Sequence, residues 1–198
     1  MKFFSKPELI SLAVIFIILI AVSWPNFSLS LRRSRDQIRR DDIGNIQAAI
    51  DVYFGDYGVF PASTSDGKMV VCKGPETDQI RLVPCNWGQD TWINLTPGVN
   101  KVYLKVLPGD PKLNQGTSYA YFSDGSRYQL FGSMEGIDEP SYDAKLAARG
   151  VKCGNKICNI GRANNVPLYI TVEEYGLQIF CSQHPKEAKC LNRKPVEE

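Results

Sequence analysis

Six cysteines are the residues whose chemistry is easiest to read in this sequence, because an even number of thiols can pair as disulfides. All six lie C-terminal to an apolar segment near the N-terminus. Zinc sites bring closely spaced cysteine or histidine pairs, whereas here the gaps are longer and the only histidine is His184. We therefore expect disulfides in an oxidising compartment, with free or metal-bound thiols as the alternative. Many pairings are possible, and we predict the nearest neighbours: Cys72 with Cys85, Cys153 with Cys158, and Cys181 with Cys190.

An acidic cluster follows in the second half of the chain, in a short segment that also contains Gly136. Calcium prefers several oxygen ligands from a flexible loop. We expect a solvated acidic loop and no cofactor. The alternative is a calcium site whose ligands are Glu135, Asp138 and Asp143, with Glu139 close by in sequence.

Catalytic chemistry finds little support. No nucleophile–base–acid set can be assembled around His184, and the glycines lack the strand, helix and spacing of a phosphate-binding loop. The composition, with 43% hydrophobic and 22% charged residues, is that of a folding chain. A net charge of +2 gives no field that indicates a nucleic-acid partner. We predict that the protein is not an enzyme.

Glu8 is the charged residue with the clearest functional potential, because it stands at the mouth of the apolar run Leu9–Val22. A carboxylate at membrane depth costs on the order of a few kcal/mol unless it is paired or protonated. We therefore expect Glu8 to act through a partner. The alternative is an interfacial acid lying among lipid headgroups.

The element that positions Glu8 is a long helix. Apolar residues continue past Pro25 to Leu31, which makes a stretch of about 23 residues, enough to span a bilayer. An amphipathic continuation follows, and the glycines at 55 and 58 predict the helix end. A helix over residues 5–54 would be about 75 Å long. The predicted buried stripe of its second half consists of Ile38, Ile43, Ile46, Ile50 and Phe54.

Two other readings of the N-terminal segment stay open. One is a cleaved secretory signal, with Lys2 and Lys6 as its basic region, Leu9–Ile20 as its apolar region and Ala21–Ser23 as the cleavage site. The other is a plain signal anchor. The acidic Glu8 and the continuing helical pattern both fit a cleaved signal poorly.

The pattern of the first 61 residues resembles type IV pilins and the pseudopilins of type II secretion. Members begin the mature chain with phenylalanine, carry a glutamate four residues on, and continue as an apolar helix with a proline partway along. Those places fall on Phe4, Glu8 and Pro25. The stretch Ile46–Pro61 resembles the point where the pseudopilin helix leaves its stem, and residues 101–143 are loosely similar to the head of the major pseudopilin.

This resemblance implies a structural filament subunit whose partners are copies of itself, other pilin-like subunits, and an inner-membrane assembly platform with its ATPase. It implies assembly roles for Phe4, Glu8 and Pro25, with Glu8 meeting the N-terminal amine of a neighbour. It also implies calcium in a loop like the acidic one here. Because Phe3 stands where the family's peptidase cuts after glycine or alanine, we expect an uncleaved N-terminus, and Lys6 or Lys2 of a neighbour would then replace the amine.

The expected fold is α+β: residues 1–31 form a leader-like start and transmembrane helix, residues 32–58 its amphipathic continuation, and residues 59–198 an extracytoplasmic head with disulfides. Asp124-Gly125 predicts a hairpin between two aromatic strands. We also predict strands at Pro167–Glu173 and Tyr175–Cys181, and a short helix over Asn100–Leu107.

Orientation rests on two opposing signals. Arginines at 32, 33, 35, 39 and 40 would normally mark a cytoplasmic flank, while the cysteines favour an oxidising exterior. We expect a single-pass protein of the cytoplasmic membrane with its head outside, present also in an extracellular filament if it polymerises. A monomeric, membrane-anchored binding module is the alternative function.

Overall fold

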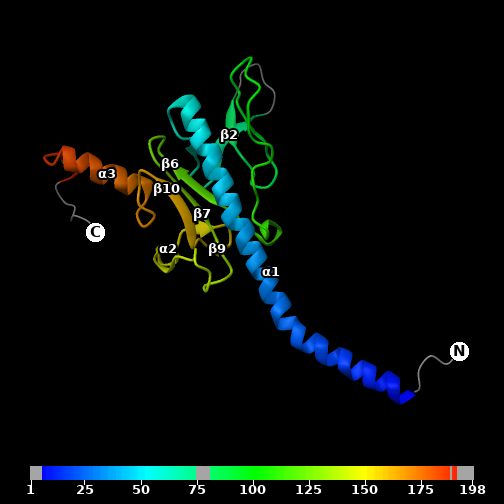
Figure 1. Ribbon diagram of the computed structural model, residues 1–198. Coiled ribbons are helices and arrows are strands. Elements are labelled where there is room, and N and C mark those ends of the chain that lie inside the picture. The colour runs from blue at the N-terminus through cyan, green and yellow to red at the C-terminus, as the bar shows by residue number, and fades with distance from the viewer. Residues whose placement is uncertain (1–5, 75–80, 188, 191–198) are drawn as a thin grey trace.

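The computed structural model describes residues 6–74, 81–187 and 189–190. The described chain is α+β: one long N-terminal helix is followed by small antiparallel sheets and two shorter helices (Figure 1). The helices are α1 (Lys6–Tyr57), α2 (Ala144–Arg149) and α3 (Val172–Gln183), with a 3₁₀ turn at Leu113–Gln115. The strands are β1 (Ala62–Ser63), β2 (Met69–Lys73), β3 (Leu82–Pro84), β4 (Trp92–Ile93), β5 (Val102–Leu104), β6 (Ala120–Ser123), β7 (Tyr128–Gly132), β8 (Lys152–Cys153), β9 (Lys156–Ile157) and β10 (Ile160–Asn164).

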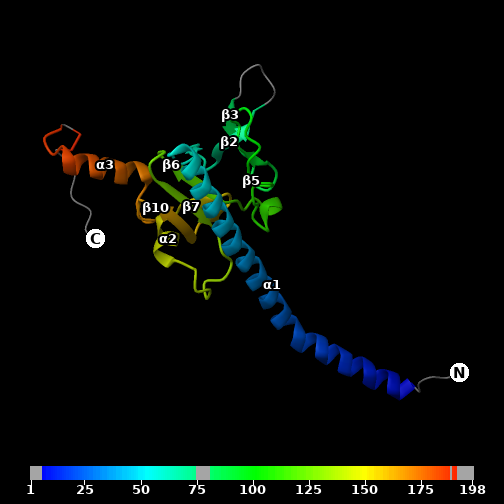
Figure 2. The same cartoon turned by 45° about the horizontal axis from the view of Figure 1, so that its top comes forward.

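Helix α1 is continuous over 52 residues and passes through Pro25 without interruption. Proline lacks a backbone donor, and helices commonly bend where one occurs; the helix curves between its free and head-bound halves in Figures 1 and 2. It ends at Tyr57, within the predicted segment 55–58. Gly58 follows, with a φ of +69° that glycine readily adopts, and its N–H donates to the carbonyl of Phe54 at 2.7 Å. The predicted start at Ser5 lies outside the described residues.

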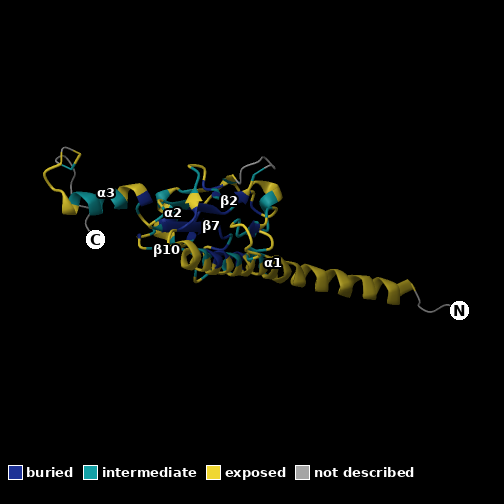
Figure 3. Ribbon diagram, turned by 90° about the horizontal axis from the view of Figure 1, so that it is seen from above, coloured by how far each residue is buried: buried dark blue, intermediate teal, exposed yellow. Residues whose placement is uncertain are grey.

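The two halves of α1 have opposite surroundings. The apolar half stands clear of the head, and Leu12, Ile15 and Ile17 are all exposed (Figure 3). The second half packs against β5, β7 and β10, where Ile46 and Ile50 have no exposed surface. By length and composition α1 is the one described helix able to cross a membrane, as a span or as a signal sequence.

The predicted apolar stripe of the second half is only partly correct. Ile43, Ile46 and Ile50 are buried, but Ile38 and Phe54 are exposed. Residues 36 and 39 continue the buried face towards the N-terminus instead. The buried face is therefore rotated relative to the predicted stripe, and at its N-terminal end it contains the charged pair Asp36 and Arg39. Hydrophobic periodicity cannot reveal charged residues on a buried face.

The central sheet has the strand order β10-β7-β6, and it is antiparallel throughout. Its β6–β7 hairpin confirms the prediction at Asp124-Gly125, although the connection runs over four residues because Ser123 pairs with Tyr128. All of β7 is buried between its neighbours and α1. The core joins helix and sheet residues, among them Ile46, Ile50, Trp92, Tyr119, Tyr121 and Leu130.

Three disulfides join the pairs of neighbouring cysteines that were predicted. Cys72–Cys85 ties β2 to the residue after β3, in the sheet ordered β1-β2-β3. Cys153–Cys158 closes the β8–β9 hairpin, and Cys181–Cys190 links the end of α3 to the segment that follows it.

Two predictions about the head were wrong. The segments Pro167–Glu173 and Tyr175–Cys181 are not paired strands, because a helix begins at Val172. Thr171 and Glu174 form a capping box: the Thr171 hydroxyl accepts from the Glu174 N–H at 3.0 Å, and the Glu174 carboxylate accepts from the Thr171 N–H at 3.3 Å. The backbone N–H groups of Thr171 and Glu174, which have no partner within the helix, are hydrogen-bonded in this way, and this favours a helix over a strand.

The predicted helix over Asn100–Leu107 is also absent. This region contains β5, in which Leu104 pairs with Trp92 and Val102 with Ile93 of β4. A strand partner roughly ten residues away decides the conformation here, and helical propensity within the segment does not.

Candidate functional site: the ion-pair network between stem and head

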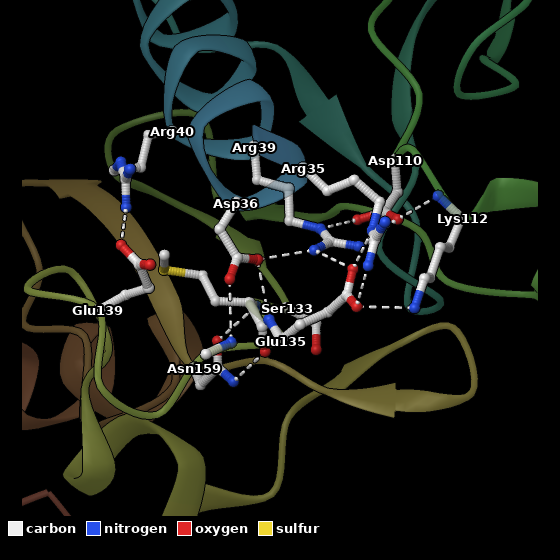
Figure 4. A network of polar contacts seen from close by, with 12 residues as sticks. Arg35, Asp36, Arg39, Arg40, Asp110, Lys112, Ser133, Glu135, Glu139 and Asn159 are labelled. Atoms are coloured by element: carbon white, nitrogen blue, oxygen red, sulfur yellow. Dashed lines mark hydrogen bonds and ion pairs between the residues drawn. The ribbon is translucent and has the colours of Figure 1, made fainter. Parts of the chain in front are cut away.

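Five charged residues of α1 form one helical face that meets the head: Arg32, Arg35, Asp36, Arg39 and Arg40. Their spacings of three and four place them on one side of the helix. The head contributes Asp110, Lys112, Glu135, Asp138 and Glu139. We call these ten residues the stem–head network; most of them are labelled in Figure 4.

Arg39 is the centre of the network and is 99% buried, with only 1% of its side chain exposed. Its Nε and Nη2 donate to the two carboxylate oxygens of Asp110 at 2.7 and 3.0 Å. Its Nη1 donates to Asp36 at 2.7 Å and to Glu135 at 3.0 Å. Burial alone would lower the pKa of Arg39. The hydrogen bonds to Asp110 and the other carboxylates raise it by more, so the pKa of Arg39 lies above its ordinary value. The guanidinium therefore stays charged inside the protein.

Asp36 fastens the helix to the backbone of the acidic loop. Its two carboxylate oxygens accept the N–H groups of Glu135 and Gly136, each at 2.9 Å (Figure 4). A Cβ at position 136 would lie 2.8 Å from Cγ of Glu139 and 3.2 Å from a carboxylate oxygen of Asp36. A side chain at this position would therefore displace the neighbouring acidic groups, which glycine avoids.

Glu135 connects the buried centre to the surface. Nε and Nη2 of Arg35 donate to its two oxygens at 2.6 and 2.8 Å, and Nζ of Lys112 donates at 2.7 Å. The hydrogen bonds from Arg35, with smaller contributions from Lys112 and Arg39, hold the pKa of Glu135 far below its usual range. The carboxylate is thus ionised wherever the head is folded at neutral pH.

The outer part of the network lies at Asp138 and Glu139, in the acidic loop 135–140. Arg32 donates to both oxygens of Asp138 at 2.5 and 2.8 Å, and Arg40 donates to Glu139 at 3.0 Å. Arg33 approaches Asp138 and Glu139 at 3.8 Å. Each of the five helix arginines therefore has a carboxylate partner in the folded head.

The three candidate calcium ligands are used differently. Glu135 and Asp138 bind arginines. Asp143 caps α2, accepting the N–H groups of Lys145 and Leu146 at 2.9 and 3.0 Å. Across residues 6–74, 81–187 and 189–190 no group of three acidic, histidine or cysteine side chains is placed to hold a metal ion. The residues do not fit calcium, and the cations of this loop are guanidinium groups.

The three predicted assembly residues belong to the stem. Phe4 lies outside the described residues. Glu8 is in the first turn of α1 and Pro25 is inside it. Both lie on the half of the helix that has no contact with the buried core of the head.

A second feature of the head is an open hollow of about 760 Å³ between β6, the β1–β2 turn and the start of α3. Its lining offers serine and threonine hydroxyls, the aromatic rings of Phe122 and Tyr169, and charges of both signs from Arg149, Lys152 and Glu173. His184 lies elsewhere, at the end of α3, with its ring stacked on Phe180 at 4.5 Å.

The buried part of the network was missed by sequence reasoning. Neither Asp36 nor Asp110 was predicted to take part in a buried ion pair. One signal was available: Arg39 and Asp36 continue the Ile43–Ile46–Ile50 spacing by about two turns towards the N-terminus. Hydrophobic patterning rejects such positions because charged residues are rarely buried unless paired.

No known protein family, curated protein or solved structure matches this chain.

Proposed function

We propose that this protein is a structural subunit of a type IV pilus-like or pseudopilus filament, anchored in the cytoplasmic membrane by α1 with its head outside the cytoplasm. The observation that carries the proposal is the division of one continuous 52-residue helix into a free apolar half and a half built into the head. A helix that served only as an anchor would have no need for such continuity. A filament subunit does need it, because a rigid stem sets the distance between a helical core and an outer layer of heads.

The disulfides and the arginines together support the outward orientation. Three disulfides are expected in an oxidising compartment. Arginines next to an apolar span usually mark the cytoplasmic side. Here they have another use, since all five contact carboxylates of the head. Their presence on this flank is therefore explained by head attachment.

Assembly would depend on the apolar half of α1. In a bundle of such helices Glu8 would pair with a cation of the neighbouring subunit, Lys6 or Lys2 when the N-terminus is uncleaved. A carboxylate in a low-dielectric site is stable only with such a partner, so the pair would fix the register between subunits. Other pilin-like subunits and an ATPase-driven membrane platform would complete the machinery.

The test is cross-linking between cysteines placed at Ile10, Val14 and Ile17, one face of α1, in cells of the native host. Wild type should give ladders of cross-linked subunits, and Glu8→Ala should insert and fold normally but give none. Ser11→Ala, which removes an uncharged polar group one turn away, is the control and should keep the ladders. Equal ladders in wild type and Glu8→Ala would remove the register role of Glu8.

A monomeric anchored binding module is the second candidate, and the hollow beside α3 is the observation that favours it. A mixed lining of hydroxyl groups, charges and two aromatic rings suits a small ligand with both polar and apolar parts. This candidate predicts no ladder in wild type or in any variant. The same cross-linking experiment therefore separates the two functions.

A further inference from the structure

Ile137 is the most exposed large apolar residue recorded in the head, with 78% of its surface accessible. It lies in the loop 135–140, between two of the acidic residues of the stem–head network. Exposed single apolar residues are common on proteins and need no explanation by themselves. The position of this one is unusual for a different reason, because the loop that carries it is fastened to α1 on both sides.

The attachment points define where Ile137 lies along the stem. On one side Gly136 donates its N–H to Asp36 at 2.9 Å. On the other side Asp138 accepts two hydrogen bonds from Arg32. Both helix residues come within five positions of Leu31, the last residue of the apolar half. At 1.5 Å per residue the loop is attached within about 8 Å of the end of the apolar segment.

That distance matches the thickness of the lipid headgroup layer. The hydrocarbon core of a bilayer is about 30 Å thick and the whole bilayer about 40–45 Å, which leaves roughly 5–8 Å on each side. When α1 spans the membrane, a loop held at this level faces the headgroups. Figures 1 and 2 show the loop that leads into α2 at the edge of the head that faces the free half of α1.

The chemistry of the loop fits that environment. An isoleucine side chain gains free energy at the boundary between headgroups and acyl chains, and arginine stems can lie along the interface with their guanidinium groups in the polar layer. The charges of the loop are already neutralised by Arg32 and Arg40. Desolvating the loop at the membrane surface therefore exposes no unpaired carboxylate of the network.

We infer that loop 135–140 is a membrane-contact surface, which rests on the outer leaflet with Ile137 inserted among the headgroups and so fixes the height and tilt of the head above the bilayer. The inference depends on the proposed membrane anchoring by α1. The occupant of the surface is the same bilayer that α1 crosses, and the contact would be lost when a subunit leaves the membrane.

The experiment uses the full-length protein in phosphatidylcholine vesicles that carry quenchers at known depths. An environment-sensitive fluorophore is attached to one introduced cysteine at a time, in Ile137→Cys, Ile15→Cys or Val59→Cys. Val59 is a matched control, since it is also an exposed aliphatic residue but follows the membrane-distal end of α1. We expect a headgroup-depth quencher to act several-fold more strongly at position 137 than at 59, and an acyl-depth quencher to act at position 15.

A second variant tests the attachment. Asp138→Asn removes the ion pair with Arg32. Combined with Ile137→Cys, this change should reduce lipid quenching of the label at position 137. Combined with Ile15→Cys, it should leave quenching of the label at position 15 unchanged. Asp124→Asn, which affects a carboxylate of the β6–β7 turn bound to Arg127, should leave both signals unchanged.

The possible failures are distinct. Quenching at 15 with equal signals at 137 and 59 would overturn the inference and leave the anchoring intact. A label at 137 that is shielded from an aqueous quencher but untouched by lipid quenchers would show contact with another protein copy, which also overturns it. Absence of quenching at 15 would overturn the anchoring and this inference together.

Discussion

The free half and the head-bound half of α1 are one helix with two different sources of stability. In the free half most side chains are apolar and exposed, so packing against the described head does not stabilise it. In the bound half the buried face combines three isoleucines with Asp36 and Arg39, and its partners lie in the same chain. The comparison teaches that apolar character alone does not identify the structural half of this helix, since its least exposed residues include a charged pair.

The largest effect is expected at the buried centre of the network. Arg39→Ala leaves Asp36 and Asp110 as buried carboxylates without their main counter-ion, and removal of one partner from such a group costs about 3–5 kcal/mol. The free energy of unfolding of the head, measured by denaturant titration of the full chain in detergent, should fall by that amount. Arg33→Ala is the control, because Arg33 is 59% exposed and 3.8 Å from its carboxylates; its cost should stay below about 1 kcal/mol. Similar losses in both variants would show that burial does not distinguish them.

The next largest expected effect is the difference in head stability between the same substitution made in each half of α1. Ile46→Ala removes a fully buried side chain from the interface between α1 and the sheet and should destabilise the head by about 2–5 kcal/mol. Ile15→Ala makes the same chemical change in the free half and should leave head stability within about 0.5 kcal/mol of wild type. The same denaturant titration checks both. A large loss of head stability in Ile15→Ala would mean that the two halves are energetically coupled.

The smallest expected effect is a change in acid sensitivity. The folded-state pKa of Glu135 lies below its unfolded value of about 4.3, so its stabilising contribution is complete above that pH and is lost as the pH falls towards the folded pKa. Wild type should therefore lose stability between about pH 5 and pH 3 more steeply than Glu135→Gln does. Glu173→Gln, at an exposed position of α3, should retain the wild-type slope. If stability falls with pH equally steeply in wild type and Glu135→Gln, Glu135 is not an acid-sensitive contact.

The elements that were predictable are those whose signals are local. The long helix follows from one unbroken pattern and ends just before a glycine suited to a left-handed conformation. The hairpin around Asp124-Gly125 follows from its turn residues, and the disulfides join cysteines that are neighbours in sequence. In each case the information needed lies within one short segment.

The failures have two causes: a second local signal that outweighs apolar alternation, and partners that are distant in sequence. Alternation of apolar residues from Pro167 to Glu173 predicted a strand, yet the Thr171–Glu174 capping box starts a helix there. The segment around β5 looked helical, yet β4 pairs with it. Of the three candidate calcium ligands, Glu135 and Asp138 bind arginines that lie 100 and 106 positions away on α1, and Asp143 caps α2.

The sequence by itself determined that the chain has a long helix with an apolar first half, a head with neighbouring disulfides, and an aromatic hairpin. Only the tertiary structure decided which face of the helix is buried and what the acidic loop binds. The reason is physical: a helix or a turn forms from contacts within a few residues, whereas a buried arginine is tolerated only where folding brings several carboxylates around it. Arg39 acquires three of these, from Asp36 on its own helix and from Asp110 and Glu135 in the head.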